Sequence, residues 1–227
     1  MSENQKKMQL LNVAVMSYES IQDERKAVMN RMRCFYRDKF SEEEWESMNF
    51  SDKDLVELDF GDLPIDFGQV IDYLNQLEEL YANTIKKEYK KHPMYDFFDN
   101  TKGLGPKLSC KLLHRTWHKD FPQVSNLWSY AGLDGPGWRN RPHNWDLTSI
   151  CYLIADQFVR LGEGNGKYRI IYDERKEYER TKPPCSKCRE HEQEERCTDG
   201  HINNKARRYA VKEFLKDYWV KKQEVSK

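Results

Sequence analysis

The sequence predicts an all-α protein, and three observations support this class. Apolar residues recur at intervals of three and four along most of the 227-residue chain, as they do on helices with one buried face. No segment shows the strict alternation of apolar and polar residues that is typical of a half-buried strand. Aromatic residues make up 13% of the chain, which is enough for a core although 33% of the residues are charged. The length suits one large domain or two small ones.

The first part of the chain, residues 1–92, is predicted to contain two long helices. The helix expected over residues 7–37 carries one apolar stripe. The stripe consists of Leu11, Val15, Tyr18, Ile21, Val28, Met32 and Phe35. The helix expected over residues 66–91 carries a heptad-like seam. The seam consists of Ile71, Leu74, Leu77, Tyr81, Thr84 and Glu88, with Leu80 and Ile85 beside it.

These two helices are expected to pair as an antiparallel, coiled-coil-like hairpin. The same seam also suits a homodimer, and the period alone does not separate the two interpretations. Between the helices, the acidic residues 41–66 are interpreted as a connector, with one short helix over residues 42–48 that Ser41 caps.

The second part, residues 93–227, is predicted to be a helical domain. Its helical segments are expected at residues 93–117, 121–133, 146–161, 167–180 and 202–221. The inward faces of the third and last segments are predicted to be Leu147, Ile150, Cys151, Ile154 and Phe158, and Ala206, Tyr209, Val211, Phe214, Leu215 and Tyr218. Cys34, Cys110 and Cys151 also lie on apolar helix faces, so they are expected to be small core residues.

A glycine-rich corner, Gly103-Leu104-Gly105-Pro106-Lys107, separates two apolar helical segments. This layout predicts a helix-hairpin-helix. Glycines allow a tight turn, and proline is tolerated in the first turn of a helix. The amide groups of that first turn and the charge of Lys107 then suit a phosphate group. An ordinary connection between two helices is the alternative interpretation.

The formal net charge of the whole chain is zero, but the charges are unevenly distributed. Residues 1–66 hold 9 Lys and Arg against 15 Asp and Glu, residues 67–100 hold 4 against 6, and residues 101–227 hold 25 against 17. An acidic half beside a basic half suggests a protein partner for the first and nucleic acid, chiefly double-stranded DNA, for the second.

Two basic segments are the candidates for phosphate contact besides the corner. The last helix carries a row of cations, namely Lys205, Arg207, Arg208 and Lys212. The loop around Arg139 and Arg141 interleaves cations with tryptophans, a mixture that can stack on bases and neutralise phosphates. A solvated helix face and a plain loop are the alternatives.

Four residues near the C-terminus have the spacing of a metal site. Cys185, Cys188, Cys197 and His201 give C-x2-C-x8-C-x3-H within a very polar segment. Zinc prefers four such ligands in a tetrahedron, and a metal supplies the stability that this segment lacks in apolar residues. The pattern therefore predicts a closed, structural zinc knob over residues 183–201. His191 is a competing fourth ligand, Asp199 is a weaker one, and a reduced, metal-free loop is the alternative.

From Gly103 to about Val220 the order of features resembles the C-terminal transposase domain of the bridge-RNA-guided insertion-sequence recombinases. The matching segments are Gly103-Leu104-Gly105-Pro106, Phe121-Pro122 with Leu127-Trp128-Ser129-Tyr130-Ala131-Gly132-Leu133, and residues 203–214. The family also places a coiled coil before its hairpin. The resemblance implies nucleic-acid handling in a mobile element.

The chain departs from this family in its catalytic parts. The family combines a RuvC-like N-terminal domain with a catalytic serine after the Ala-Gly-Leu block. Residues 1–66 show no βαβ pattern, and the loop Asp134-Gly135-Pro136-Gly137-Trp138-Arg139 contains no serine. The departures argue against strand transfer by this chain.

The leading hypothesis is therefore a non-catalytic DNA-backbone-binding protein derived from a mobile element or phage. A protein interaction module, such as a viral regulator or inhibitor, is the first alternative. A recombinase or nuclease subunit is the second, with Asp134, Asp146 and Asp156 as candidate metal ligands. The polar first ten residues and the short apolar runs predict no secretory signal and no membrane span, hence the cytoplasm of a prokaryotic cell or an infected host.

Overall fold

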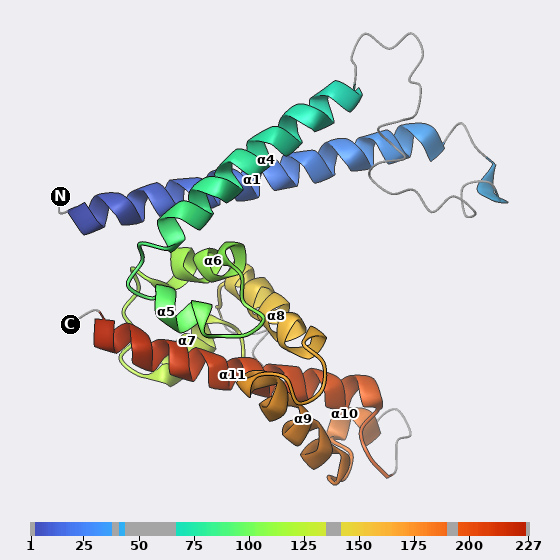
Figure 1. The fold of residues 1–227 in the computed structure, drawn as a ribbon. Helices are drawn as coiled ribbons and strands as arrows, with labels where there is room; N and C mark the ends of the chain where they lie inside the picture. Colours follow the sequence, from blue (N-terminus) through green and yellow to red (C-terminus); the bar gives the residue numbers. More distant parts are fainter. Residues whose placement is uncertain (1–2, 38–40, 44–66, 135–141, 190–194, 226–227) are drawn as a thin grey trace. The chain divides into compact units, whose positions relative to one another are not determined.

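The computed structural model describes residues 3–37, 41–43, 67–134, 142–189 and 195–225. In these ranges the chain forms helices and no strand, which confirms the predicted all-α class (Figure 1). None of the helices found there combines the length and the apolar character that crossing a membrane requires.

The chain divides into two compact units, Met1–Glu88 and Tyr89–Lys227, where the sequence places the boundary after residue 92. The first unit contains α1 (Glu3–Arg37) and α4 (Phe67–Tyr89). Helix α4 runs back across α1 in the opposite direction, as the predicted antiparallel hairpin requires (Figure 1). Of the predicted helix over residues 42–48, only Glu42 and Glu43 belong to the described residues, and both are helical.

A polar network joins the two helices of the hairpin. The hydroxyl of Tyr18 donates a hydrogen bond to Oε1 of Glu78 at 3.0 Å, and Nε of Arg25 pairs with Oε2 of the same carboxylate at 3.0 Å. Both side chains of the Arg25 pair are largely shielded from water, so this pair is screened less than a surface ion pair.

Part of the predicted apolar stripe is buried and part is not. Leu11, Val15, Tyr18, Val28 and Met32 are buried as expected. Phe35, however, is 40% exposed. The prediction that Cys34 is a core residue is wrong, because its side chain is exposed. Cys34 lies two residues beyond Met32, which places it about 200° around the helix from the buried face.

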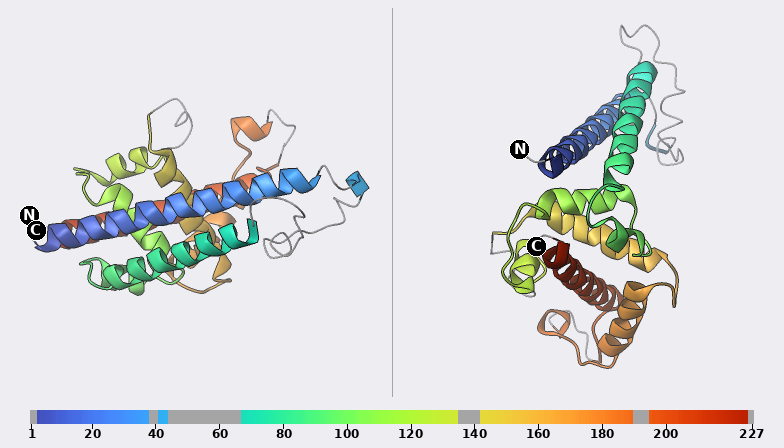
Figure 2. Two further views of the ribbon diagram at one scale, coloured as in Figure 1. Left: turned by 90° about the horizontal axis from the view of Figure 1, so that it is seen from above. Right: turned by 60° about the vertical axis from the view of Figure 1, so that its left-hand side comes forward.

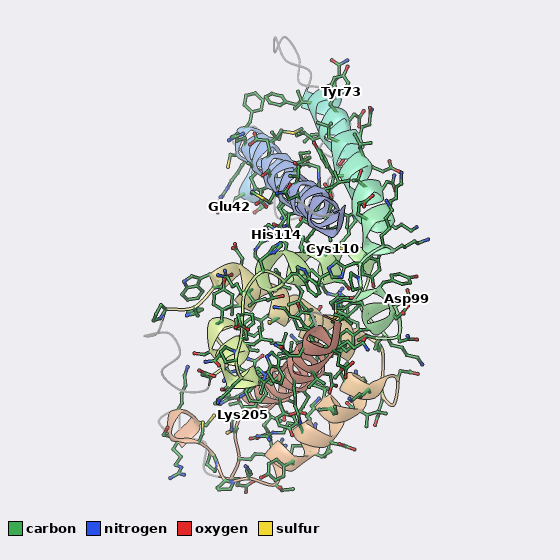
Figure 3. All side chains as sticks on the ribbon, turned by 90° about the vertical axis from the view of Figure 1, so that its left-hand side faces the viewer. Glu42, Tyr73, Asp99, Cys110, His114 and Lys205 are labelled. Atoms are coloured by element: carbon green, nitrogen blue, oxygen red, sulfur yellow. The ribbon has the colours of Figure 1, made fainter. Side chains whose placement is uncertain are left out.

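The apolar residues of α4, in the seam and beside it, are only partly buried. Ile71 and Ile85 are buried, whereas Leu77 and Leu80 are 43% and 60% exposed. Tyr73 on the same helix is also largely exposed (Figure 3).

The second unit contains seven described helices. They are α5 (Tyr95–Asp99), α6 (Pro106–Thr116), α7 (Val124–Tyr130), α8 (Trp145–Arg160), α9 (Lys167–Arg180), α10 (Ser186–Arg189) and α11 (Asp199–Val225). Helix α11 runs through the middle of the unit and contacts α7, α8 and α9 (Figures 1 and 2). Helix α6 packs on α8.

Aromatic rings fill the core around α11. The ring of Phe158 stacks on Tyr168 at 4.8 Å between centroids and meets Phe214 edge-on at 5.6 Å. Tyr218 is fully buried, and its hydroxyl shares a 2.7 Å hydrogen bond with Oγ1 of Thr116 on α6. Of the predicted inward face of α8, all five residues are buried.

Small residues let α9 approach α11 closely. Ala206 and Ala210 form a buried cluster with Tyr172. The hydroxyl of Tyr172 donates to Oδ1 of Asn203 at 2.6 Å, and the hydroxyl of Tyr168 donates to Oδ2 of Asp217 at 2.8 Å. The two helices are therefore fixed by both packing and hydrogen bonds.

One residue of the predicted inward face of α11 does not point inward. Tyr209 is 38% exposed, in contrast to Phe214 and Leu215, which are fully buried. The guanidinium of Arg175 lies 4.6 Å from the centre of the Tyr209 ring, so a cation–π contact holds this ring at the surface.

A buried lysine caps the C-terminal end of α6. Nζ of Lys222 donates hydrogen bonds to the carbonyl oxygens of Thr116 at 2.8 Å and Lys119 at 2.5 Å. Its side chain is 5% exposed, and burial lowers its pKa. A cation at this position satisfies carbonyl groups that the helix itself leaves unpaired.

Candidate metal centre and basic cavity

The four predicted metal ligands converge in the second unit. The ligand atoms of Cys185, Cys188, Cys197 and His201 all lie within 4.8 Å of one another. Nδ1 of His201 lies 2.9 Å from Sγ of Cys188 and 3.6 Å from Sγ of Cys185. The three sulfurs and the imidazole therefore lie together, as the spacing of these residues in the sequence predicts.

Local structure explains how these residues meet. Cys188 lies on α10, and the amide of Arg189 closes the turn by donating to the carbonyl of Cys185 at 3.0 Å. His201 lies in the first turn of α11, where the amide of Ile202 donates to the carbonyl of Thr198 at 2.9 Å. The fully buried side chain of Ile202 forms a small apolar cluster with Cys188 and Cys197.

The sulfur of Cys197 accepts two hydrogen bonds. It accepts from the backbone amide of Cys185 at 3.4 Å and from Nζ of Lys205 at 3.3 Å. Burial raises the pKa of the Cys197 thiol, but these and neighbouring hydrogen bonds outweigh burial and the net shift is downward. With a divalent cation bound, three thiolates would leave one negative charge, and the ammonium of Lys205 lies where it would compensate this charge.

The donor set suits zinc better than a hard cation, because sulfur and imidazole are the ligands of structural zinc sites. A tetrahedron with zinc–sulfur bonds of about 2.3 Å has edges of about 3.8 Å, and the observed group is close to this size. Asp199 pairs with Arg196 at 3.4 Å and is not part of the group, and His191 lies outside the described residues.

A cavity of about 520 Å³ lies beside the ligands and is bounded by α9, α10 and α11. Its charged lining consists of Arg175, Lys182, Arg189, Lys205, Arg208, Lys212 and Glu179. Six cations thus face one carboxylate. Figure 3 shows Lys205 on the side of α11 toward the cysteine knob (residues 183–201).

The single carboxylate of the cavity is buried. Glu179 is 3% exposed and accepts hydrogen bonds from Arg175 at 2.5 Å and from Lys205 at 3.1 Å. Burial raises the pKa of Glu179, but these two cations outweigh burial and lower it overall. In the part of the chain that the structure describes, the remaining four cations of the cavity form no ion pair.

The glycine corner is at the surface. Gly103 has a φ of +93°, and a Cβ there would lie 3.3 Å from Cδ1 of Leu161, so the position requires glycine. Gly105 is exposed with open space around it and precedes Pro106 at the start of α6. Lys107 is exposed in the same turn. Gly105 and Lys107 are therefore accessible from solvent, and phosphate binding at this corner stays a prediction.

The predicted basic residues are divided among three places. Lys205, Arg208 and Lys212 line the cavity. Arg207 instead pairs with Asp156 of α8 at 3.2 Å. The glycine corner contacts another part of α8, near Leu161. Arg139 and Arg141 lie outside the described residues.

The three candidate acidic ligands do not form a metal site among the described residues, where the Cys/His group is the only such cluster. Asp156 also pairs with Arg160 at 2.7 Å, and Asp146 lies 3.5 Å from Arg115. Asn144 caps the N-terminus of α8, and its side chain accepts from the amide of Leu147 at 2.7 Å.

The block Tyr130-Ala131-Gly132-Leu133 has a clear structural reason for its glycine. Gly132 has a φ of +67°, and a Cβ there would lie 2.9 Å from both Cδ2 of His143 and Oγ1 of Thr148. The hydroxyl of Thr148 donates to the carbonyl of Ala131 at 2.9 Å. The turn after α7 thus docks directly on the start of α8.

Sequence reasoning missed the residues that α9 and α10 contribute to the cavity. Arg175 and Glu179 are spaced by four residues, a spacing that predicts an ion pair on a helix surface. Nothing in that spacing shows that the pair is buried against α11, because the burial depends on a contact between distant parts of the chain.

Comparison with protein-family models, with curated proteins and with solved structures found no match to this chain.

Proposed function

We propose that this protein binds the phosphate backbone of nucleic acid, chiefly double-stranded DNA, without catalysing a reaction on it. The observation that carries the proposal is the excess of cations over carboxylates in the cavity beside the Cys/His group. Phosphate oxygens are the natural counter-ions for clustered arginines and lysines. Origin from a mobile element or phage is part of the same proposal and rests on the resemblance of residues 103–220.

A structural zinc ion is the second element of the proposal. Cys185, Cys188, Cys197 and His201 would hold it, and all four protein positions are then filled, which is typical of structural sites. The ion would fix the start of α11 against α10 and thereby hold Arg208 and Arg189 at the cavity.

The glycine corner is the third element. The first amides of α6 lack partners within the helix, and they lie beside Gly105 and Lys107 at the surface. A phosphate group is well placed to accept from such amides. Contacts of this kind position a duplex but carry little base information, so we expect weak sequence preference.

The test is a titration of a labelled DNA duplex at rising salt concentration. The logarithm of the affinity should fall linearly with the logarithm of the salt concentration, with a slope of about −0.9 for each phosphate neutralised. Lys107→Gln should weaken binding equally for unrelated sequences and reduce the slope by about one contact. An affinity that does not respond to salt would contradict the proposal.

A second candidate function is protein binding by the first unit, which the exposed apolar residues Leu77 and Leu80 of α4 favour. The partner is either another protein or a second copy of this chain. Capture from a nuclease-treated lysate separates this function from the first, because a protein partner survives the treatment and a nucleic-acid bridge does not. Sedimentation of wild type and Leu80→Glu tests the homodimer, which the added charge should dissociate.

A further inference from the structure

We propose that the cavity between α9, α10 and α11 binds a phosphomonoester, meaning a terminal phosphate group. This inference goes beyond backbone binding, because it assigns the cavity to a chemical group that an internal phosphodiester does not provide. It rests on the charge and the fixed geometry of the cavity, and it does not require that the protein bind duplex DNA.

The charge balance favours a dianion. Arg175 and Lys205 share the carboxylate of Glu179, and among the described residues Lys182, Arg189, Arg208 and Lys212 have no acidic partner. A terminal phosphate carries about −1.5 to −2 charges at neutral pH, whereas a backbone diester carries one. A doubly charged group therefore compensates this cavity better than a single diester does.

The size of the cavity points in the same direction. A volume of about 520 Å³ is in the range of pockets that enclose a small ligand, about 300–1,000 Å³. A cavity of this size has room for a terminal phosphate together with the nucleoside that carries it, as at the end of a strand or in a free nucleotide.

The cationic walls are held in place before any ligand arrives. Nε of Arg189 donates to the carbonyl of Pro184 at 2.9 Å, and Nζ of Lys212 lies 4.2 Å from the centre of the Trp128 ring. The guanidinium of Arg175 lies 5.0 Å from the centre of the Tyr178 ring and 4.6 Å from that of the Tyr209 ring. Such preorganisation lowers the entropic cost of binding.

One arginine of the cavity has its guanidinium outside any ion pair among the described residues. Arg208 is half-buried on the cavity wall and forms no ion pair with any described residue. A guanidinium can hold two oxygens of one phosphate group at once, which makes Arg208 the residue on which recognition should depend most.

The experiment compares two forms of one short, labelled single-stranded oligonucleotide, with a 5′-phosphate or a 5′-hydroxyl, by fluorescence anisotropy on the zinc-loaded full chain. We expect the phosphorylated form to bind about tenfold more tightly, the effect of one charge-assisted hydrogen bond. Arg208→Gln should abolish this difference. Equal binding of both forms by the wild type would overturn the proposal.

A matched control separates the cavity from general surface charge. Lys216→Gln removes the same charge from the same helix, but Lys216 is exposed, pairs with Glu213 and does not line the cavity. This variant should keep the tenfold difference. If it loses the difference as completely as Arg208→Gln does, the cavity is not the site. Zinc content and helicity of both variants confirm that each is folded, and Lys182→Gln provides a second cavity variant.

Competition identifies the source of the phosphate group. Equal competition by inorganic phosphate and by a nucleoside 5′-monophosphate would support a site that recognises the phosphate alone, and stronger competition by the nucleotide would support a strand end. No competition by either would overturn the proposal. Backbone binding is measured separately, with a duplex that carries hydroxyl groups at both 5′ ends, so the two proposals can fail independently.

Discussion

Lys205 donates a hydrogen bond from Nζ to Sγ of Cys197 at 3.3 Å, which connects the candidate metal centre to the cavity. The same ammonium donates to the buried carboxylate of Glu179 at 3.1 Å. One side chain thus donates hydrogen bonds both to a sulfur of the knob and to the carboxylate of Glu179 on α9.

Replacing Lys205 by methionine should therefore impair both neighbours. We expect the zinc affinity to fall about 10–100-fold, since the thiolate loses a hydrogen bond from outside the ligand set. We expect the free energy of unfolding to fall by about 1–3 kcal/mol, because Glu179 keeps only Arg175 as a partner. Competition with a chelating dye and urea unfolding measure the two effects. Lys216→Met is the control, and an unchanged zinc affinity would refute this role of Lys205.

Removal of a ligand should release the metal. Cys188→Ser should lower the zinc content from one ion per chain to well below one, because a hydroxyl does not replace a thiolate at such a site. Elemental analysis of the purified protein measures this content. The exposed Cys34 provides the matched control, and Cys34→Ser should leave one zinc per chain. A wild-type protein purified without zinc, and unable to take it up, would show that the cluster is not a metal site.

Stability should fall below neutral pH because of a buried histidine. His92 is 9% exposed, its Nδ1 accepts the amide of Met94 at 3.1 Å, and burial lowers its pKa to about 4. An unfolded histidine has a pKa of about 6.5, so between these values the unfolded chain binds more protons than the folded one. The stabilisation due to neutral His92 is fully present above about pH 6.5 and is lost as the pH falls to about 4. The loss in the free energy of unfolding amounts to at most about 3 kcal/mol.

Substitution isolates this contribution from other titrating groups. In His92→Asn the amide oxygen can still accept the Met94 amide but no longer titrates. Urea unfolding at about pH 7 and about pH 4.5 should therefore show a smaller loss of stability for this variant than for the wild type. The control variant His118→Asn, at an exposed position, should show the same decrease in the free energy of unfolding between the two pH values as the wild type. Identical losses in all three proteins would contradict the assignment to His92.

Two glycines should respond to alanine in opposite directions. Gly132→Ala should cost about 1–3 kcal/mol, because φ is +67° and the new methyl group would lie 2.9 Å from the side chains of His143 and Thr148. Gly200→Ala should be neutral or stabilise by up to about 1 kcal/mol, since Gly200 lies in α11 with open space around it. Thermal unfolding of the zinc-loaded proteins measures both changes, and equal effects would contradict this account.

Local patterns in the sequence were sufficient to predict most helices and the Cys/His group. Periodic apolar residues located α8, whose five predicted inward residues are buried, and the spacing of the cysteines located the Cys/His group. Cys110 and Cys151 are in the core as predicted, and burial raises the pKa of each thiol to about 12. In each case the signal lies within a few turns of one segment.

Features that depend on distant contacts were not predictable in this way. Tyr209 has the spacing of a core residue, but Arg175 of α9 holds its ring at the surface. Glu179 has the appearance of a solvated charge, yet it is buried against Lys205 of α11. Arg175, Glu179, Lys205 and Tyr209 all line the cavity. The lining therefore depends on how α9 packs on α11, and the sequence of either helix alone does not predict it.

Helix α11 carries the candidate metal ligand His201, cavity residues up to Lys212, the core ring of Tyr218 and Lys222, which caps α6. Each residue advances the helix by about 100°, so inserting or deleting a single residue between His201 and Lys222 would turn one end away from its partners. Substitutions can therefore accumulate on the solvent side of this segment during evolution, whereas its length must stay constant.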